Sequence, residues 1–225
     1  MSEIDSALEG VQIKKIYEES DSLADLHITL TSDRGNYFRM KLLHKLSSWT
    51  NEEELNQLRK EEDLEEYVRH LNKLIRFKLI RAPTNMDNRF IRTELGERAV
   101  NATRALERGI GKRKAEKIYK SSLGPNSIRA FLRVYGRKGE FSFTPKESKY
   151  SVSEIAKLFS FILRGIDRIS AMDKLDSAGL LDYKDDGFIY FEPRKAREFY
   201  RYLLELHAII EEASMKMPIS DADRI

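Results

Sequence analysis

Two stretches of this 225-residue chain follow the same plan, and this internal repeat constrains the fold more than any other feature. The segment HLNKLIRFKLIRA (70–82) aligns without a gap with AMDKLDSAGLLDY (171–183). After a deletion of three residues, Phe90-Ile91 in the first copy matches Phe188-Ile189 in the second. The repeat predicts two related modules in one chain.

The hydrophobic periodicity changes character at the same place in both copies. Spacings of three and four (64, 68, 71, 75 and 166, 169, 172, 175) predict a helix with one apolar face, which in the first copy includes Val68. Residues 79–93 and 180–193 then predict strand, turn and strand, with Asp186-Gly187 as a tight turn because Gly accepts a positive φ. Ahead of these segments, residues 37–48 and 127–135 predict a first helix. Thr50 with Glu53, and Ser151 with Glu154, have the capping-box spacing that opens a second helix.

This order of elements is that of a winged helix-turn-helix, and the residues resemble that superfamily directly. The two aligned segments resemble the stretch from recognition helix to wing in MarR- and PadR-type regulators, and FIRTELGERA (90–99) resembles the wing strand running into the following helix. The resemblance covers about residues 35–105 and 125–205. It implies a mainly α fold with small β-wings (α+β): two tandem winged-helix modules joined by a basic helical connector, with a long C-terminal helix.

The chain accordingly divides into five parts: an N-terminal arm (1–33), module 1 (34–103), the connector (104–124), module 2 (125–193), and a C-terminal helix and tail (194–225). The arm is either packed on the modules or a partly disordered lead. The C-terminal helix is apolar nearly all round, so it needs more than one covering surface. We therefore expect a homodimer whose interface is formed by Phe199, Leu203, Leu206 and Ile210.

Composition narrows the possible classes of site and partner. The chain has no Cys and four His, which excludes disulfides, thiolate zinc sites, iron–sulfur clusters and cysteine nucleophiles. The net charge of +3 implies no polyanionic partner by itself, but residues 104–149 carry thirteen Lys or Arg against four Glu. No apolar run approaches the roughly 20 residues that span a bilayer. The polar start MSEIDSALEG is unlike a signal peptide. We expect a cytoplasmic, nucleoid-associated protein with no membrane partner.

In module 1, the polar face of the third helix and the wing carry groups that suit DNA. Arg and Asn pair with guanine and adenine edges, whereas Lys and the wing arginines suit phosphates. Acidic residues at 61–63, 65 and 66 crowd the start of this helix, where the helix dipole alone would explain them. The candidates are Arg69, Asn72, Lys73, Arg76, Asn88, Arg89 and Arg92.

Module 2 and the connector supply further candidates. The third helix of module 2 offers Arg164, Arg168, Ser170 and Lys174, although a solvated face of mixed charge explains them equally well. Gly109-Ile110-Gly111 resembles the turn of a helix-hairpin-helix element, which presents N–H groups to a phosphate, followed by Lys112, Arg113 and Lys114. The alternative is a glycine C-cap followed by a solvated basic helix.

Catalysis has little support in the sequence. Gly-Ile-Gly-Lys (109–112) lacks the phosphate-binding spacing G-x-x-x-x-G-K-[ST], no G-x-S-x-G elbow occurs, and no His pair has the spacing of metal ligands. His207, near Glu205 and Glu211, fits an interfacial or surface histidine better than a metal site. We expect no enzymatic activity, no cofactor and no metal.

These features together predict a DNA-binding protein, a dimeric transcriptional regulator whose partner is double-stranded DNA. One alternative is a tandem winged-helix scaffold that binds protein, similar to kleisin-associated subunits of SMC complexes or ESCRT-II subunits. Another is a replication initiator or partition-type DNA binder. The acidic start of the third helix and the small net charge favour the scaffold, whereas the basic connector and wing favour DNA.

Overall fold

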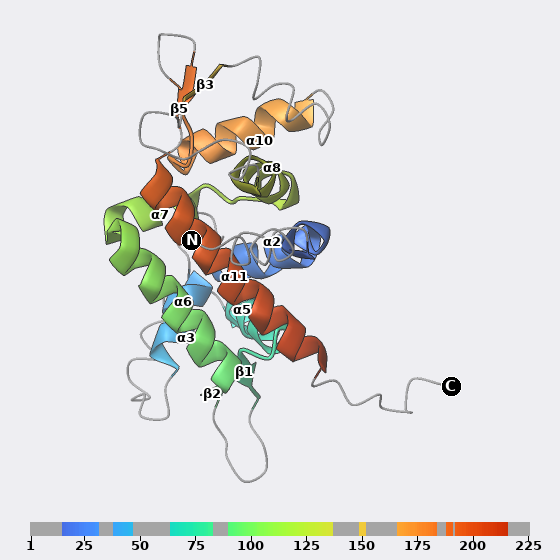
Figure 1. Ribbon diagram of the computed structural model, residues 1–225. Coiled ribbons are helices and arrows are strands. Elements are labelled where there is room, and N and C mark those ends of the chain that lie inside the picture. Colours follow the sequence, from blue (N-terminus) through green and yellow to red (C-terminus); the bar gives the residue numbers. More distant parts are fainter. Residues whose placement is uncertain are drawn as a thin grey trace, which may run out of the picture.

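The computed structural model describes residues 15–31, 38–46, 64–82, 90–136, 149–151, 166–183, 188–190 and 192–215, and these are mainly helical (Figure 1). Two small antiparallel sheets accompany the helices. The helices are α2 (Ser20–Thr31), α3 (Phe38–Lys45), α5 (Leu64–Arg76), α6 (Glu94–Ile110), α7 (Lys112–Lys120), α8 (Pro125–Gly136), α10 (Ile166–Ser177) and α11 (Pro193–Met215). The strands are β1 (Ile80–Arg81), β2 (Ile91–Arg92), β3 (Lys149–Ser151), β4 (Asp182–Tyr183) and β5 (Phe188–Tyr190).

The internal repeat is visible in the backbone hydrogen bonds that end α5 and α10. After α5, the Leu79 N–H donates to the Leu74 carbonyl at 3.0 Å; after α10, the Leu180 N–H donates to the Leu175 carbonyl at 2.9 Å. Each turn leads into an antiparallel pair, β1 with β2 and β4 with β5. The predicted succession of helix, hairpin and helix is therefore confirmed in both copies.

The two copies differ at the residue with positive φ that these turns require. Gly179 (φ 64) adopts this conformation without a Cβ penalty, whereas its counterpart is Lys78 (φ 54). The Lys78 ammonium donates to the carbonyl of Ala213, near the end of α11, at 2.8 Å. In the second copy the link runs the other way, because Lys195 of α11 donates to the Gly179 carbonyl. Both turns are thus tied to α11.

The helices that follow the two hairpins, α6 and α11, pack against each other in opposite directions. Arg98, near the start of α6, pairs with Glu212 of α11 at 2.7 Å, while Gly109, near the end of α6, lies under the side chain of Glu198. Figure 1 shows both helices running through the middle of the molecule, with α3, α5 and the β1–β2 hairpin at one end and α8, α10 and the second sheet at the other. This helix pair joins the two halves.

The N-terminal arm is a packed element over residues 15–31. On α2, Leu23, Leu26 and Leu30 are buried, and the helix contacts α3, α8 and α11. The His27 Nδ1 lies 3.2 Å from the Tyr202 hydroxyl of α11 in the same core. Of the two alternatives for the arm, the structure shows the packed one for these residues.

The prediction that the apolar seam of α11 forms a dimer interface is wrong in this structure. Phe199, Leu203 and Leu206 have no exposed surface, and Ile210 is packed against the same core. The covering surfaces come from α6 and α2 of the same chain. The sequence correctly indicated that α11 needs several surfaces, but the chain supplies them itself.

The first helices of both copies are confirmed as α3 and α8. The predicted second helices fall in 47–63 and 152–165, and the Asp186-Gly187 turn in 184–187; all of these lie outside the described residues. Ser151, expected to cap the second of these helices, is the last residue of β3, and the residues that it would cap lie outside the described part of the chain. Strand β3 pairs with β5, and the sequence did not predict it. Val68, expected on the apolar face of α5, is 46% exposed.

Candidate nucleic-acid interface

The connector folds as two helices separated by one residue. Gly109 and Ile110 belong to α6, and only Gly111 (φ 86) breaks the helix, with its N–H still donating to the Glu107 carbonyl at 2.8 Å. Buried Tyr119 of α7 donates its hydroxyl to the Thr103 carbonyl of α6 at 3.2 Å, which holds the two helices together. This geometry matches the glycine C-cap alternative, because the break is confined to Gly111.

The start of α7 has the donors expected at a helix N-terminus. The first backbone bonds of the new helix run from the Lys114 and Ala115 N–H groups to the Gly111 carbonyl, at 3.1 and 3.0 Å. The N–H groups of Lys112 and Arg113 therefore make no backbone hydrogen bond, and their side chains are exposed. Positive side chains at the positive end of a helix dipole gain nothing from the helix itself.

A second basic segment meets this junction from the far end of the sequence. Lys114 of α7 pairs with Glu192, just ahead of α11, at 3.2 Å, so the start of α11 lies beside α7. Figure 1 shows the upper end of α11 next to α7 and the adjoining end of α6. We call the exposed cations of this junction the basic ridge: Arg104, Arg108, Lys112, Arg113, Arg194 and Arg197.

Ion pairing leaves the ridge strongly positive. The carboxylates of Glu192 and Glu198 are engaged by Lys114 and by Arg201, the latter at 3.0 Å. The six ridge residues have no carboxylate partner in the described part of the chain. Burial lowers the pKa of Lys195, which lies beneath the ridge and close to Lys114 and Lys117. The ridge is a local excess of positive charge on a chain of small net charge.

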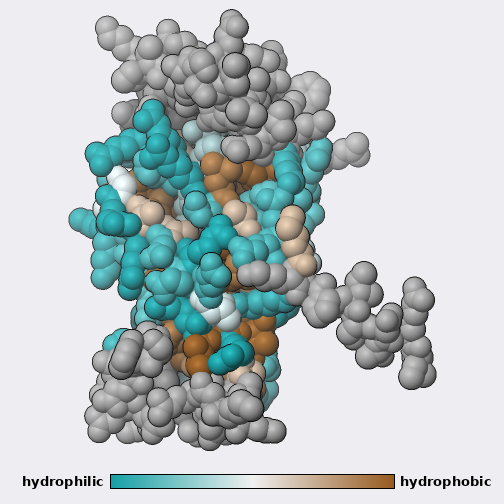
Figure 2. Space-filling view, turned by 60° about the horizontal axis from the view of Figure 1, so that its bottom comes forward, coloured by the Kyte–Doolittle hydropathy of each residue, from teal (hydrophilic) through white to brown (hydrophobic). Residues whose placement is uncertain are grey.

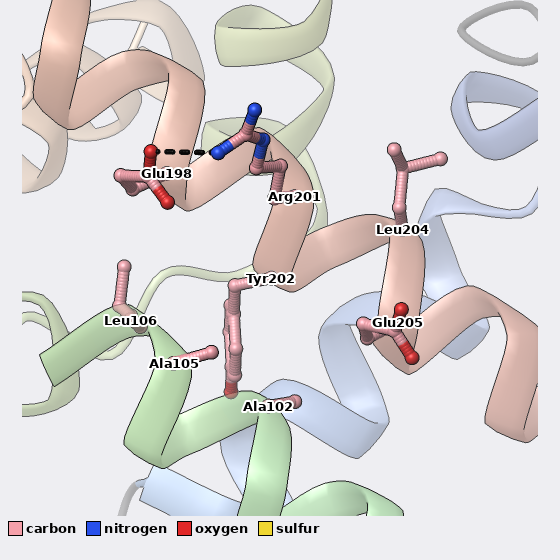
Figure 3. A pocket seen from close by; sticks show the side chains of 8 residues that line it. All are labelled: Ala102, Ala105, Leu106, Glu198, Arg201, Tyr202, Leu204 and Glu205. Atoms are coloured by element: carbon pink, nitrogen blue, oxygen red, sulfur yellow. Dashed lines mark hydrogen bonds and ion pairs between the residues drawn. The ribbon is translucent and has the colours of Figure 1, made fainter. Parts of the chain in front are cut away.

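A shallow groove lies between α6 and α11 beside the ridge (Figure 3). Its volume is about 320 Å³, with Ala102, Ala105 and Leu106 on the α6 side. Figure 3 shows Glu198 and Arg201, both from α11, paired with each other at one end, and Glu205 further along the same helix. The groove carries both signs of charge on its α11 side and has no excess of cations of its own.

The structure divides the module 1 candidates into engaged and available groups. Arg69 pairs with Glu66 at 2.7 Å and with Glu65 at 3.5 Å on its own helix, and Arg76 pairs with Asp25 of α2 at 3.1 Å. Asn72 and Lys73 are exposed on the same face and take part in no such pair with another described residue.

Of the wing candidates of module 1, the structure describes Arg92, which is used within the fold. Arg92 is 12% exposed, donates to the Leu43 and His44 carbonyls at the end of α3, and pairs with Glu97. It holds α3 against β2, which gives it a structural role. Asn88 and Arg89 lie outside the described residues.

In module 2, the described part of the third-helix face is acidic. Ser170, Asp173 and Asp176 are exposed on α10, whereas Lys174 is half-buried. Arg164 and the side chain of Arg168 lie outside what the structure describes. The described surface of α10 therefore offers little to a phosphate backbone.

The sequence missed the contribution of α11 to the basic surface. Arg194 and Arg197 lie about eighty residues from the connector, and only the antiparallel packing of α6 and α11 brings them to it. The spacing of Arg194, Arg197 and Arg201 on a predicted helix would have indicated a basic stripe, but not its neighbour.

No family model, curated protein or solved structure matches this chain. No described helix combines the length and the hydropathy needed to cross a membrane. Within the described ranges, no three His, Asp or Glu side chains come together as metal ligands.

Proposed function

We propose that this chain is a DNA-binding protein of the tandem winged-helix type, a cytoplasmic, nucleoid-associated transcriptional regulator that grips duplex DNA through its basic ridge. The observation that carries the proposal is the ridge itself, where six cations from two segments distant in sequence gather with no carboxylate partner in the described part of the chain. A fold that stabilised only itself would gain nothing from gathering like charges, because their mutual repulsion costs free energy.

A polyanion removes that cost. Each phosphate neutralised by Lys or Arg releases condensed counterions, so binding is strong at low salt and weakens steeply as salt rises. Free N–H groups at the start of α7 add donors of the kind that hold phosphates at helix N-termini. Under this proposal, the ridge sets affinity and the exposed face of α5 sets sequence preference.

A protein-binding scaffold is the second candidate. The exposed carboxylates of Asp173 and Asp176 on α10 favour it, because they would repel phosphates from the third helix of module 2. A division of labour is also consistent with these charges, with module 1 and the ridge on DNA and module 2 on a protein partner.

The test is fluorescence anisotropy of a random duplex titrated with the wild type and with Lys112→Glu/Arg113→Glu at several salt concentrations. The variant should lose affinity on every duplex sequence. The slope of log K against log salt should fall in magnitude by about 2, since each lost phosphate contact removes roughly 0.9.

The matched control is Lys41→Glu/Lys45→Glu, which makes the same change of net charge at exposed positions on α3. Its affinity should stay close to that of the wild type. Equal losses in the two variants would show that net charge and not the ridge matters, and absence of wild-type binding at low salt would move the assignment to the scaffold.

A further inference from the structure

The exposed face of α5 carries an apolar residue that the fold does not use. Val68 and Met215 are the two large hydrophobic side chains exposed among the described residues, and Val68 lies in the middle of its helix. A single exposed valine is ordinary on a protein surface. Val68 matters here because the neighbouring polar groups on this face could bind the same ligand.

One turn further along α5 is Asn72, which is exposed and makes no hydrogen bond within the described chain. The two arginines of the same face are held by carboxylates, Arg69 by Glu65 and Glu66 and Arg76 by Asp25. The Arg69 pairs offset one of the two negative charges that Glu65 and Glu66 place in the first turn of the helix. With respect to the described residues, the groups left available on this face are Val68, Asn72 and Lys73.

We infer that this face recognises A·T base pairs in the major groove, with the Asn72 amide on adenine and the Val68 methyls against a thymine methyl. The inference rests on the proposed function and specifies what module 1 recognises. A carboxamide pairs with the major-groove edge of adenine through two hydrogen bonds. Its oxygen accepts from the adenine N6 amino group while its NH₂ donates to N7. A guanine presents two acceptors at this edge and cannot satisfy the amide oxygen.

The geometry on the helix suits this pairing. Residues four apart lie one above the other with Cβ atoms about 5–6 Å apart, so Val68 and Asn72 can address the same or adjacent base pairs. The major groove, about 12 Å wide, admits a helix, and thymine alone among the bases presents a methyl group there. Lys73, beside Asn72, is placed to reach a phosphate.

The test compares short duplexes of equal length that are A·T-rich or G·C-rich. Two further A·T-rich duplexes carry either uracil for thymine, which removes the methyl group, or an adenine analogue with C–H in place of N7. Both changes alter only the major-groove edge, so a preference that arises in the minor groove would not respond to them. The proteins are the wild type, Val68→Ala, Asn72→Ala and, as a matched control on the same helix, Glu65→Ala.

The wild type should bind the A·T-rich duplex about tenfold more tightly than the G·C-rich one. Uracil should weaken the binding of the wild type severalfold and that of Val68→Ala less, because the shorter alanine side chain keeps only part of the contact with the thymine methyl. The N7 analogue should weaken the binding of the wild type severalfold and leave that of Asn72→Ala unchanged. Glu65→Ala should keep the responses of the wild type. All three positions are exposed, so their thermal unfolding should match that of the wild type.

Equal wild-type affinity for A·T-rich and G·C-rich duplexes would overturn the inference while leaving the proposed function intact. So would equal sensitivity of the wild type and the two variants to the modified bases. Absence of binding to every duplex at low salt would instead overturn the proposed function, so the two failures are distinguishable.

Discussion

Two of the four histidines are held in surroundings that disfavour their charged form. Burial in the core between α2 and α11 lowers the pKa of His27 to about 4. Burial, together with the nearby Arg104 and Arg92, lowers the pKa of His44 to about 4. His44 lies 3.1 Å from the Thr103 hydroxyl, and this contact links α3 to α6.

These pKa values predict that the fold loses stability in mildly acidic solution. Below the ordinary histidine pKa of about 6.5, the unfolded chain binds protons that the folded chain does not, so the free energy of unfolding falls as pH decreases towards 4. The slope should approach ~1.4 kcal/mol per pH unit for His27. Urea unfolding at a series of pH values measures it.

A His27→Leu variant provides the comparison, because leucine fills the core without titrating. Its stability should depend less steeply on pH than that of the wild type in the same window. A wild-type free energy of unfolding that is constant or rises with acidification would contradict the assignment.

Arg39 shows how a buried charge can serve a helix end. It is 3% exposed and donates to the carbonyls of Ile28 and Thr29, the latter at 2.5 Å, near the end of α2. These carbonyls belong to the last turn, where the helix itself provides no donor. The arginine lies on α3, so it fastens two helices that share the core.

At the scale of the elements, the start of α6 requires both a cap and a close approach. The Thr93 hydroxyl accepts from the Gly96 N–H at 3.1 Å and donates to carbonyls of the turn after α5. A Cβ at Gly96 would lie 2.0 Å from the Leu79 carbonyl oxygen, a backbone atom that cannot move aside. Only glycine lets α6 pass so close to β1.

Gly96→Ala should therefore destabilise the protein by several kcal/mol, even though alanine usually stabilises a helix by up to ~1 kcal/mol relative to glycine. Gly124→Ala is the matched control, because a Cβ at that position meets nothing within 4 Å. Chemical denaturation of both variants measures the difference. A Gly96→Ala variant as stable as the wild type would show that the approach of α6 to β1 is looser than described.

The elements were predictable where a residue pattern is local. The apolar spacing of α5, the apolar character of α11 and the break near Gly111 all follow from neighbours in the sequence. Strand β3 was not predictable, because it pairs with residues of β5 about forty positions away. Its own three residues also show no clear alternation of apolar and polar side chains. Val68 was misplaced since its spacing from Leu71 fits the apolar face, yet it lies at the edge of that face.

The candidate site was predictable in part for the same reason. The connector cations follow from a run of charge in the sequence, whereas the contribution of α11 depends on tertiary packing. Which arginines are already paired could not be predicted either, because Arg76 meets Asp25 only through the docking of α5 near α2.

At the scale of the whole molecule, the two copies of the repeat share one core. Helix α11 contacts both α6 and α2. On the surface, Figure 2 shows a hydrophilic band across the middle of the molecule, with hydrophobic residues gathered on either side of it. The helix seam that could have joined two chains instead joins two halves of one chain.

This arrangement predicts that the protein is a monomer in solution. Light scattering coupled to gel filtration should give a mass near 26.3 kDa over a wide range of protein concentration. A stable mass twice as large would show that another surface, distinct from the Phe199 and Leu203 seam, holds two copies together. Ridge variants should leave the mass unchanged, which separates assembly from DNA binding.

The His27–Tyr202 contact joins residues 175 positions apart. During synthesis, α2 is therefore made long before the helix that it packs against. At a synthesis rate of about 5–20 residues per second, α2 leaves the ribosome on the order of 10–40 s before α11. During that interval Leu23, Leu26 and Leu30 have no α11 to cover them. The nascent chain thus depends on α11, and a ribosome that stalls before this helix is made leaves a product that exposes part of its core to chaperones and proteases.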